Sequence, residues 1–225
     1  MLKYTLPALA AASLVGAAFW FSAPRPAETV TSATALGLSD IRDVQATPED
    51  REGYFEWTIG AEDAPVTVIE YGSFTCPHCA TFHLDVLPKL KAEFVEAGTV
   101  RFVYREVYFD KYGLWAGIMA RCGGEERYPG MVDLIYERQA TWARGSDAEV
   151  FENLSRLARL AGIGDDQIAE CARDEANALM LVSVYQENAE RDGITSTPSF
   201  MINGTRYGNM SLQAFRDLIA EKAGN

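Results

Sequence analysis

The sequence feature that most restricts the fold is a Cys-x-x-Cys pair, Cys76 and Cys79, placed directly after a strand-like segment. The preceding residues 65–74 (PVTVIEYGSF) are rich in β-branched and aromatic side chains, which is typical of a buried strand. Residues 76–94 follow with helical character, and residues 99–107 (TVRFVYREV) again indicate a strand. Strand, helix and strand in this order form a βαβ unit, so we expect an α/β fold with parallel strands.

The rest of the chain interrupts this α/β pattern with helices. Residues 111–192 have apolar side chains at helical spacing, and we expect an inserted helical domain there with no strand. Strand character returns at 196–204, with 205–208 as a hairpin partner and a last helix after the cap candidate Ser211. The α/β domain is then expected to comprise residues 54–110 and 193–225.

The N-terminal segment predicts export. Residues 4–24 are uncharged and lie between Lys3 and Arg25, and about 20 apolar residues suffice to span a bilayer. No clear cleavage site adjoins the apolar run, so residues 1–23 are either a signal peptide or an uncleaved membrane anchor. Residues 24–53 are rich in Ala, Thr, Ser and Pro and indicate a linker. Either way we expect the remainder to face an oxidising, extracytoplasmic space.

The charge of the chain argues against nucleic acid as a partner. The 225 residues carry a formal net charge of −12, and no run of Lys or Arg could neutralise successive phosphates. The acidic residues are spread along the chain, which is typical of a solvated surface.

Four chemistries use a closely spaced cysteine pair, and three of them fit poorly. Covalent haem attachment requires a His after the second Cys, but Ala80 stands there. Zinc requires four ligands, whereas Cys122 and Cys171 stand alone and only His78 and His83 are available. A structural bridge over so short a loop would restrain the unfolded chain very little. The pair therefore predicts redox exchange, with no cofactor besides its own disulfide.

The position of the pair at a helix start favours this chemistry. Unpaired backbone N–H groups and the positive end of the helix dipole point at the Cys76 sulfur and stabilise its thiolate. His78 can add a positive charge or a hydrogen bond. Stabilising the reduced form makes the disulfide an oxidant. Because Cys79 lies one turn further on, on the buried side, we expect partners to attack Cys76.

The stretch SFTCPHC resembles the active site of the DsbA-type thiol:disulfide oxidoreductases. FHLDVLPKL, VRFVYREV and the Q-x-x-W pattern from Gln139 to Trp142 resemble the alphaproteobacterial branch of that family. The resemblance implies a thioredoxin-like fold with an inserted helical domain and a periplasmic location. It also implies that the protein oxidises newly exported proteins and is reoxidised by a membrane quinone-linked partner of the DsbB type.

The resemblance also assigns roles to residues of the motif. Cys76 corresponds to the nucleophilic cysteine, Cys79 to the resolving one and His78 to the residue that tunes them. Thr197 and Pro198 resemble the cis-proline loop of the family, against which an extended substrate pairs as an added strand. We therefore expect a cis peptide bond before Pro198.

Glu70 corresponds to a buried acidic residue that helps to move a proton to the departing Cys79. The family often pairs this residue with a lysine, but here the equivalent strand offers only Arg105 or Tyr104 as weak substitutes. The alternative is a strand carboxylate that faces the edge of the sheet. We expect His83 to be a surface residue of the helix, without a catalytic role.

Cys122 and Cys171 both fall in the helical insertion. Two leftover cysteines in an oxidising compartment usually pair, and the branch that this chain resembles carries such a second bridge. We therefore predict a structural disulfide; the alternative is two separate buried thiols.

Three functions remain open from sequence. The first is a dithiol oxidase that donates the Cys76–Cys79 disulfide. The second is a disulfide isomerase or reductase, because Thr before the proline also occurs in isomerases; the absence of an obvious dimerisation segment before Tyr54 argues against it. The third is a non-catalytic, thioredoxin-like binding or assembly protein, in which a degraded cysteine pair would be expected.

Overall fold

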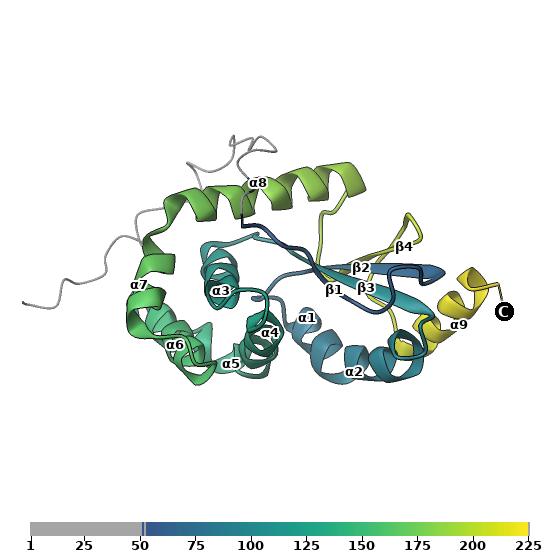
Figure 1. Ribbon diagram of the computed structural model, residues 1–225, viewed down its shortest axis with the longest axis horizontal. Coiled ribbons are helices and arrows are strands. Elements are labelled where there is room, and N and C mark those ends of the chain that lie inside the picture. The colour runs from purple at the N-terminus through teal and green to yellow at the C-terminus, as the bar shows by residue number, and fades with distance from the viewer. Residues whose placement is uncertain (1–50, 52, 225) are drawn as a thin grey trace, which may run out of the picture.

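The computed structural model describes residue 51 and residues 53–224 (Figure 1). The signal peptide or anchor predicted at 1–23, and nearly all of the linker predicted at 24–53, therefore lie outside the described residues. Within the described part, no helix combines the length and the apolar character needed to cross a bilayer.

The centre of the fold is a mixed five-stranded sheet with the order β1-β3-β2-β4-β5. Strands β2 and β3 run parallel, which confirms the predicted βαβ unit, and the other pairs are antiparallel. The edge strand β1 was not predicted, because three residues are too few for a recognisable alternation. The strands are β1 (Trp57–Ile59), β2 (Val66–Gly72), β3 (Val100–Glu106), β4 (Ser199–Ile202) and β5 (Thr205–Tyr207).

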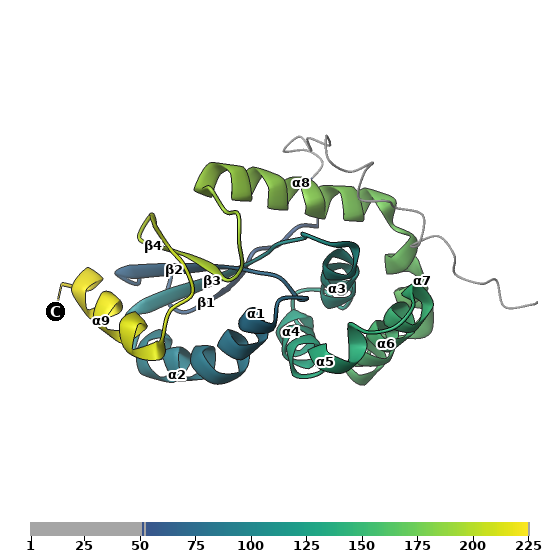
Figure 2. The same cartoon turned by 180° about the vertical axis from the view of Figure 1, so that it is seen from behind.

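The central strand β2 is covered on both faces. Val66 and Val68 belong to the apolar core that also contains Phe82, whereas Tyr71 packs on the opposite face with Ala189. Figures 1 and 2 show α1 and α2 on one side of the sheet and α8 on the other. Burial on both faces explains the nearly continuous β-branched and aromatic run in the β2 sequence.

The helix after the cysteine motif departs from a regular α-helix. It comprises α1 (Pro77–Thr81), the π-helical turn η4 (Phe82–Val86), α2 (Leu87–Leu90) and a second π-helical turn η5 (Lys91–Val95). Pro88 lies within the first two positions of α2, directly after η4. Proline has no N–H for the regular i to i−4 hydrogen bond, so a wider turn before it is physically reasonable.

Between β3 and β4 the described chain is helical, as predicted, and we call this part the helical insertion. Its elements are α3 (Lys111–Cys122), α4 (Tyr128–Glu137), α5 (Gln139–Trp142), α6 (Asp147–Leu160), α7 (Asp165–Arg173) and α8 (Glu175–Asp192). One apolar core continues from Phe102 in the sheet to Tyr128, Trp142 and Leu154 in the insertion. The insertion is therefore packed firmly against the end of the sheet that carries the cysteine pair.

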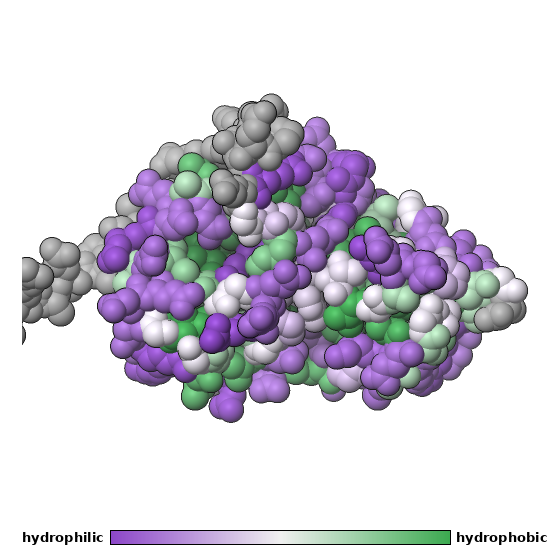
Figure 3. All heavy atoms as spheres, in the orientation of Figure 1, coloured by the Kyte–Doolittle hydropathy of each residue, from purple (hydrophilic) through white to green (hydrophobic). Residues whose placement is uncertain are grey.

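The last helix, α9 (Leu212–Lys222), begins where the sequence predicts. The hydroxyl of Ser211 accepts a hydrogen bond from the Ala214 N–H over 3.2 Å, which caps the helix. Hydrophilic side chains cover most of the face seen in Figure 3, as expected of a solvated surface.

The structure joins Cys122 and Cys171 in the second disulfide that the sequence predicts. The bridge connects the end of α3 to α7, with 5.8 Å between the Cα atoms and a sequence separation of 49 residues. It therefore ties together two helices of the insertion that are far apart along the chain.

Reduction of this bridge is expected to lower the free energy of unfolding by about 3 to 4 kcal/mol, because a long loop is released in the unfolded chain. The measurement is denaturant unfolding of Cys76→Ser protein with the bridge intact and reduced. The Cys76→Ser background removes any contribution of the redox pair. Equal stabilities of the two forms would contradict the prediction.

Candidate active site

The Cys76–Cys79 pair lies where β2 passes into α1. Cys76 is the N-cap residue of α1 with an extended backbone, and Pro77 occupies the first turn, where its missing N–H is not needed. Both sulfurs are free thiols, Cys76 partly exposed and Cys79 with 0% of its surface exposed. A partner can therefore reach Cys76 and not Cys79, as the sequence predicts.

The surroundings of Cys76 stabilise its thiolate. A hydrogen bond from the Cys79 thiol is the largest cause, and together with Thr197 and the backbone N–H groups of Cys79 and His78 it lowers the pKa of Cys76 to about 5. Partial burial acts in the opposite direction. At neutral pH the reduced protein therefore carries a thiolate at Cys76, which is both a nucleophile and a good leaving group.

The surroundings of Cys79 have the opposite effect. The pKa of the Cys79 thiol is raised by its hydrogen bond to Cys76, by burial and by the negative charge of Glu70. At neutral pH the Cys79 thiol therefore keeps its proton, whereas the Cys76 thiol has lost its proton. Two sulfurs with separated acidities can take different roles in one exchange reaction.

The predicted cis-proline loop lies against the pair. The peptide bond from Thr197 to Pro198 is cis, and the Thr197 carbonyl oxygen lies 3.4 Å from Cys76 Sγ. Strand β4 begins at the next residue. The loop therefore brings backbone groups of residue 197 next to the reactive sulfur.

His78 is exposed, and its backbone N–H contributes to the low pKa of Cys76. Tuning by its imidazole stays a prediction. Within the part of the chain that the structure describes, no three His, Cys, Asp or Glu side chains gather as metal ligands would.

The expectation for His83 was wrong: its side chain is buried beneath the pair, with only 5% of the residue exposed. His83 Nε2 lies 2.9 Å from Glu70 Oε2, and Glu70 is itself 0% exposed on the central strand β2. The alternative of an edge-facing carboxylate at position 70 is therefore also wrong. Burial raises the pKa of Glu70, and the neighbouring His83 opposes this rise.

The π-helical turn η4 explains why His83 was missed. A π turn holds more residues than an α turn, so the neighbours Phe82 and His83 both point inward, which α-helical spacing does not predict. The His83 ring stacks on Tyr136 at 4.4 Å between centroids and meets the edge of Tyr104 at 5.0 Å. The hydroxyl groups of these two tyrosines are 2.7 Å apart.

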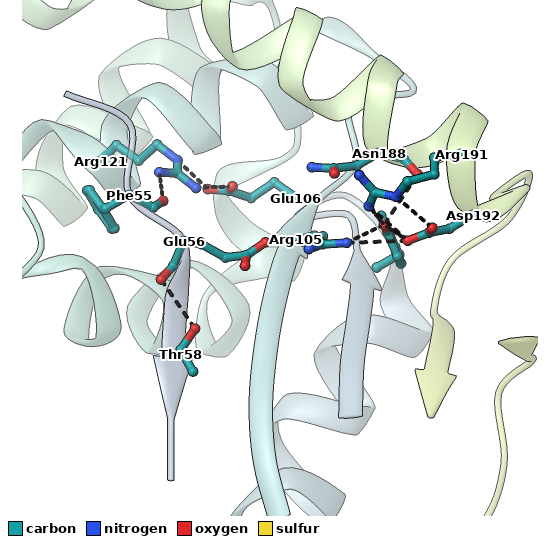
Figure 4. A network of polar contacts seen from close by, with 10 residues as sticks. Phe55, Glu56, Thr58, Arg105, Glu106, Arg121, Asn188, Arg191 and Asp192 are labelled. Atoms are coloured by element: carbon teal, nitrogen blue, oxygen red, sulfur yellow. Dashed lines mark hydrogen bonds and ion pairs between the residues drawn. The ribbon is translucent and has the colours of Figure 1, made fainter. Parts of the chain in front are cut away.

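Arg105 and Tyr104, the two residues considered as substitutes for a lysine partner of Glu70, form hydrogen bonds with other residues. Arg105, which is labelled in Figure 4, donates to Glu56 over 2.5 Å. It also donates to the Tyr71 hydroxyl over 2.8 Å. Tyr104 lies opposite Glu70 in the β2–β3 register, but its hydroxyl contacts Tyr136. His83 is therefore the partner of Glu70. Its position a few residues after the cysteine pair, on the same helix, was the signal in the sequence that could have indicated it.

Comparison with known proteins agrees with this geometry. Residues 55–221 match the model of the family described as thioredoxin. The chain belongs to the thioredoxin family. A candidate protein-disulfide oxidoreductase of Rickettsia conorii is 30% identical over 158 residues, which cover 70% of this chain and 56% of the relative. The chain thus spans little more than half the length of that relative.

Solved structures show which form of the thioredoxin fold this is. Alpha-DsbA1 of Wolbachia pipientis superposes with a TM-score of 0.69 at 25% identity, over 86% of this chain and 96% of the other. BdbD of Bacillus subtilis superposes with a TM-score of 0.67 at 22% identity, over 80% of this chain and 97% of the other. The chain has the DsbA form of the thioredoxin fold, with a helical insertion, and the resemblance to the alphaproteobacterial branch is confirmed.

The acidity of Cys76 predicts a pH-dependent difference in stability between the reduced and oxidised forms of this thioredoxin-family chain. The thiol titrates at about 8.5 in an unfolded chain, whereas in the folded, reduced protein Cys76 titrates at about 5. Ionisation therefore stabilises the reduced form fully above about pH 8.5, and this contribution is lost as the pH falls through about 5.

Denaturant unfolding of both forms at several pH values between about 5 and 8 measures the effect. The stability of the reduced form minus that of the oxidised form should rise with pH. The stability of Cys76→Ser protein minus that of the same oxidised form should lack this rise, because the variant has no Cys76 thiol to ionise. A difference that does not change over this range would contradict the low pKa.

Proposed function

We propose that this chain is an extracytoplasmic thiol:disulfide oxidoreductase that donates its Cys76–Cys79 disulfide to exported proteins during their oxidative folding. The observation that carries the proposal is the opposite effect of the site on its two sulfurs. Cys76 is accessible and acidic, whereas Cys79 is buried and retains its proton. A disulfide whose reduced form is stabilised in this way is a strong oxidant.

The reaction proceeds in two exchanges. A partner thiolate attacks Cys76 Sγ, the Cys76–Cys79 bond breaks, and its electron pair goes to Cys79, which takes up a proton. A second partner thiolate then attacks the partner sulfur of the mixed disulfide, and Cys76 departs as a thiolate. The partner loses two electrons and becomes a disulfide, and this chain gains them.

The proton for Cys79 comes from the buried polar pair beneath it. The charge of Glu70 raises the pKa of Cys79, so an ionised Glu70 disfavours a Cys79 thiolate and favours its protonation. Glu70 and His83 are 2.9 Å apart, and neither side chain has another hydrogen-bond partner among the described residues. The pair can therefore store a proton while Cys79 is oxidised and release it when the bond breaks.

The remaining parts of the proposal follow from the N-terminal segment and from the DsbA form of the fold. The uncharged segment 4–24 supports export to the periplasm, and a membrane tether if it is not cleaved. The reduced chain would then pass these two electrons on to a membrane quinone-linked reoxidase of the DsbB type. The disulfide itself serves as the redox centre, without a separate cofactor.

The equilibrium with glutathione tests the function. With Cys122 and Cys171 left bridged, the Cys76–Cys79 pair is expected to have a potential near that of DsbA, about −120 mV. A value near about −270 mV, as in thioredoxin, would overturn the oxidase proposal and favour a reductant. If the chain restores a substrate protein with scrambled disulfides to its native form, it acts as an isomerase. If the Cys76–Cys79 pair exchanges with neither glutathione nor a substrate, the chain is a binding protein.

A further inference from the structure

Gln139 connects the helical insertion to the backbone of the cysteine motif. It is the first residue of α5, and its side-chain Nε2 donates to the carbonyl oxygens of Phe74 over 2.8 Å and of Cys76 over 3.0 Å. These two carbonyl groups lie on either side of Thr75, in the turn that leads into α1. One carboxamide group therefore holds both ends of the turn that carries the reactive sulfur.

Gln139 itself stands on a rigid support. Trp142, at the other end of α5, is 1% exposed, and its Nε1 donates to the Ile135 carbonyl oxygen over 2.8 Å. The Q-x-x-W pattern thus places a buried anchor one turn after the amide donor. Because an anchored helix has little freedom, the position of the Gln139 amide is set by the insertion.

The orientation of the Cys76 carbonyl group matters to the sulfur. The next residue is Pro77, so the Cys76–Pro77 peptide plane sets how α1 begins and where the N–H groups of His78 and Cys79 point. The Gln139 amide also donates a hydrogen bond to the Cys76 carbonyl oxygen, and this donor offsets the partial negative charge of that oxygen near the thiolate. Both effects favour the ionised sulfur.

A second contact supports the same turn. Thr75 donates its hydroxyl hydrogen to Asp110 Oδ2 over 2.5 Å, and Asp110 caps α3 by accepting from the Gly113 N–H over 2.9 Å. The start of the insertion therefore also holds the turn. The amide of Gln139 acts on the carbonyl groups, and Asp110 acts on the side chain between them.

We propose that Gln139 is a positioning residue through which the helical insertion holds the cysteine turn so that backbone N–H groups face the Cys76 sulfur. This inference rests on the proposed function, because its effect is on the stability of the thiolate that drives exchange. It assigns the insertion a part in the redox chemistry itself.

The test compares Gln139→Met with Gln167→Met in the full chain. Methionine keeps the length of the side chain and removes its donors. Gln167 is a matched control, because its Nε2 also donates to a cysteine carbonyl, that of Cys122 over 2.7 Å, but at the second disulfide. Gln139→Ala serves as a second variant with a shorter side chain, and thermal unfolding shows that each variant is folded.

Two measurements report on the thiolate: the Cys76 pKa from its ultraviolet absorbance, and the equilibrium constant with glutathione. Loss of one net hydrogen bond corresponds to about a fivefold change in an equilibrium constant. We expect Gln139→Met to raise the Cys76 pKa and to shift the glutathione equilibrium about fivefold toward the oxidised protein. Gln167→Met should leave both measurements unchanged.

Unchanged values of both in the Gln139 variants, with or without a loss of thermal stability, would overturn the inference and leave Gln139 a purely structural residue. An equal shift in Gln167→Met would overturn it as well. Failure of the proposed function is a separate result, since it shows as a thioredoxin-like potential of the unsubstituted protein. A difference between that protein and Gln139→Met would still support the positioning role.

Discussion

Cys76→Ser protein is expected to lose disulfide exchange by roughly a thousandfold or more, because serine cannot form the mixed disulfide through which the reaction passes. Cys76 is the accessible sulfur of the pair and the one that the site holds as a thiolate. The measurement is the rate at which the oxidised protein converts a dithiol peptide to its disulfide. A rate within tenfold of the unsubstituted protein would contradict the assignment of Cys76.

The matched variant is Cys79→Ser, and its expected outcome is different. Cys79 is fully buried, so its removal leaves Cys76 able to form a mixed disulfide with a partner. No internal thiol remains to release that partner, and the covalent complex should accumulate. Mass spectrometry of Cys79→Ser protein incubated with an oxidised peptide detects it. A complex formed equally well by Cys76→Ser protein would show that the two roles are not divided as proposed.

Arg121→Met is expected to lower the free energy of unfolding by about 3 to 5 kcal/mol, the usual cost of leaving one buried charge without its partner. Arg121 and Glu106 form a buried ion pair, and Arg121 also donates to the Phe55 carbonyl oxygen over 2.9 Å (Figure 4). The Tyr128 hydroxyl donates to the same carboxylate over 2.7 Å. The pair therefore joins the end of β3 to α3 and α4 of the insertion and to the segment just before β1.

Denaturant unfolding of two further variants tests the reason for this loss. Arg156→Met removes an exposed pair with Glu152, in which 65% of the Arg156 side chain is exposed, and should cost about 1 kcal/mol or less. The double variant Arg121→Met with Glu106→Gln should be more stable than Arg121→Met alone, because no charge is left unpaired. If Arg121→Met and Arg156→Met cost the same, the buried pair does not contribute as argued.

The polar groups beneath the sulfurs differ from those that the resemblance to the DsbA family suggested. A lysine partner for Glu70 was sought on β3, but the partner is an imidazole on the helix that carries the cysteine pair. The two groups come from one βαβ unit, the carboxylate from β2 and the imidazole from η4.

The local sequence was sufficient for the βαβ unit, the cysteine chemistry and the last helix. The β-branched run of β2, Pro77 at a helix start and the cap residue Ser211 all act on neighbouring residues along the chain. Such effects depend on backbone sterics and on hydrogen bonds within one turn. They can therefore be predicted from the order of neighbouring residues in the sequence. The pairing of Cys122 with Cys171 needed the resemblance as well as the count of cysteines.

Only the tertiary structure decided which side chains surround the sulfurs. Strand β1 is too short to show in the sequence and is held by its register with β3. His83 turns inward because a π turn shifts the helical phase, and the amide of Gln139 reaches the Cys76 carbonyl oxygen across 63 residues of sequence. These contacts arise when the insertion and the helix pack against the end of the sheet. Packing between distant elements leaves no periodic trace in a single sequence, and for that reason the sequence identified the reactive pair, Glu70 and the cis-proline loop, but not the positions of His83 and Gln139 beside them.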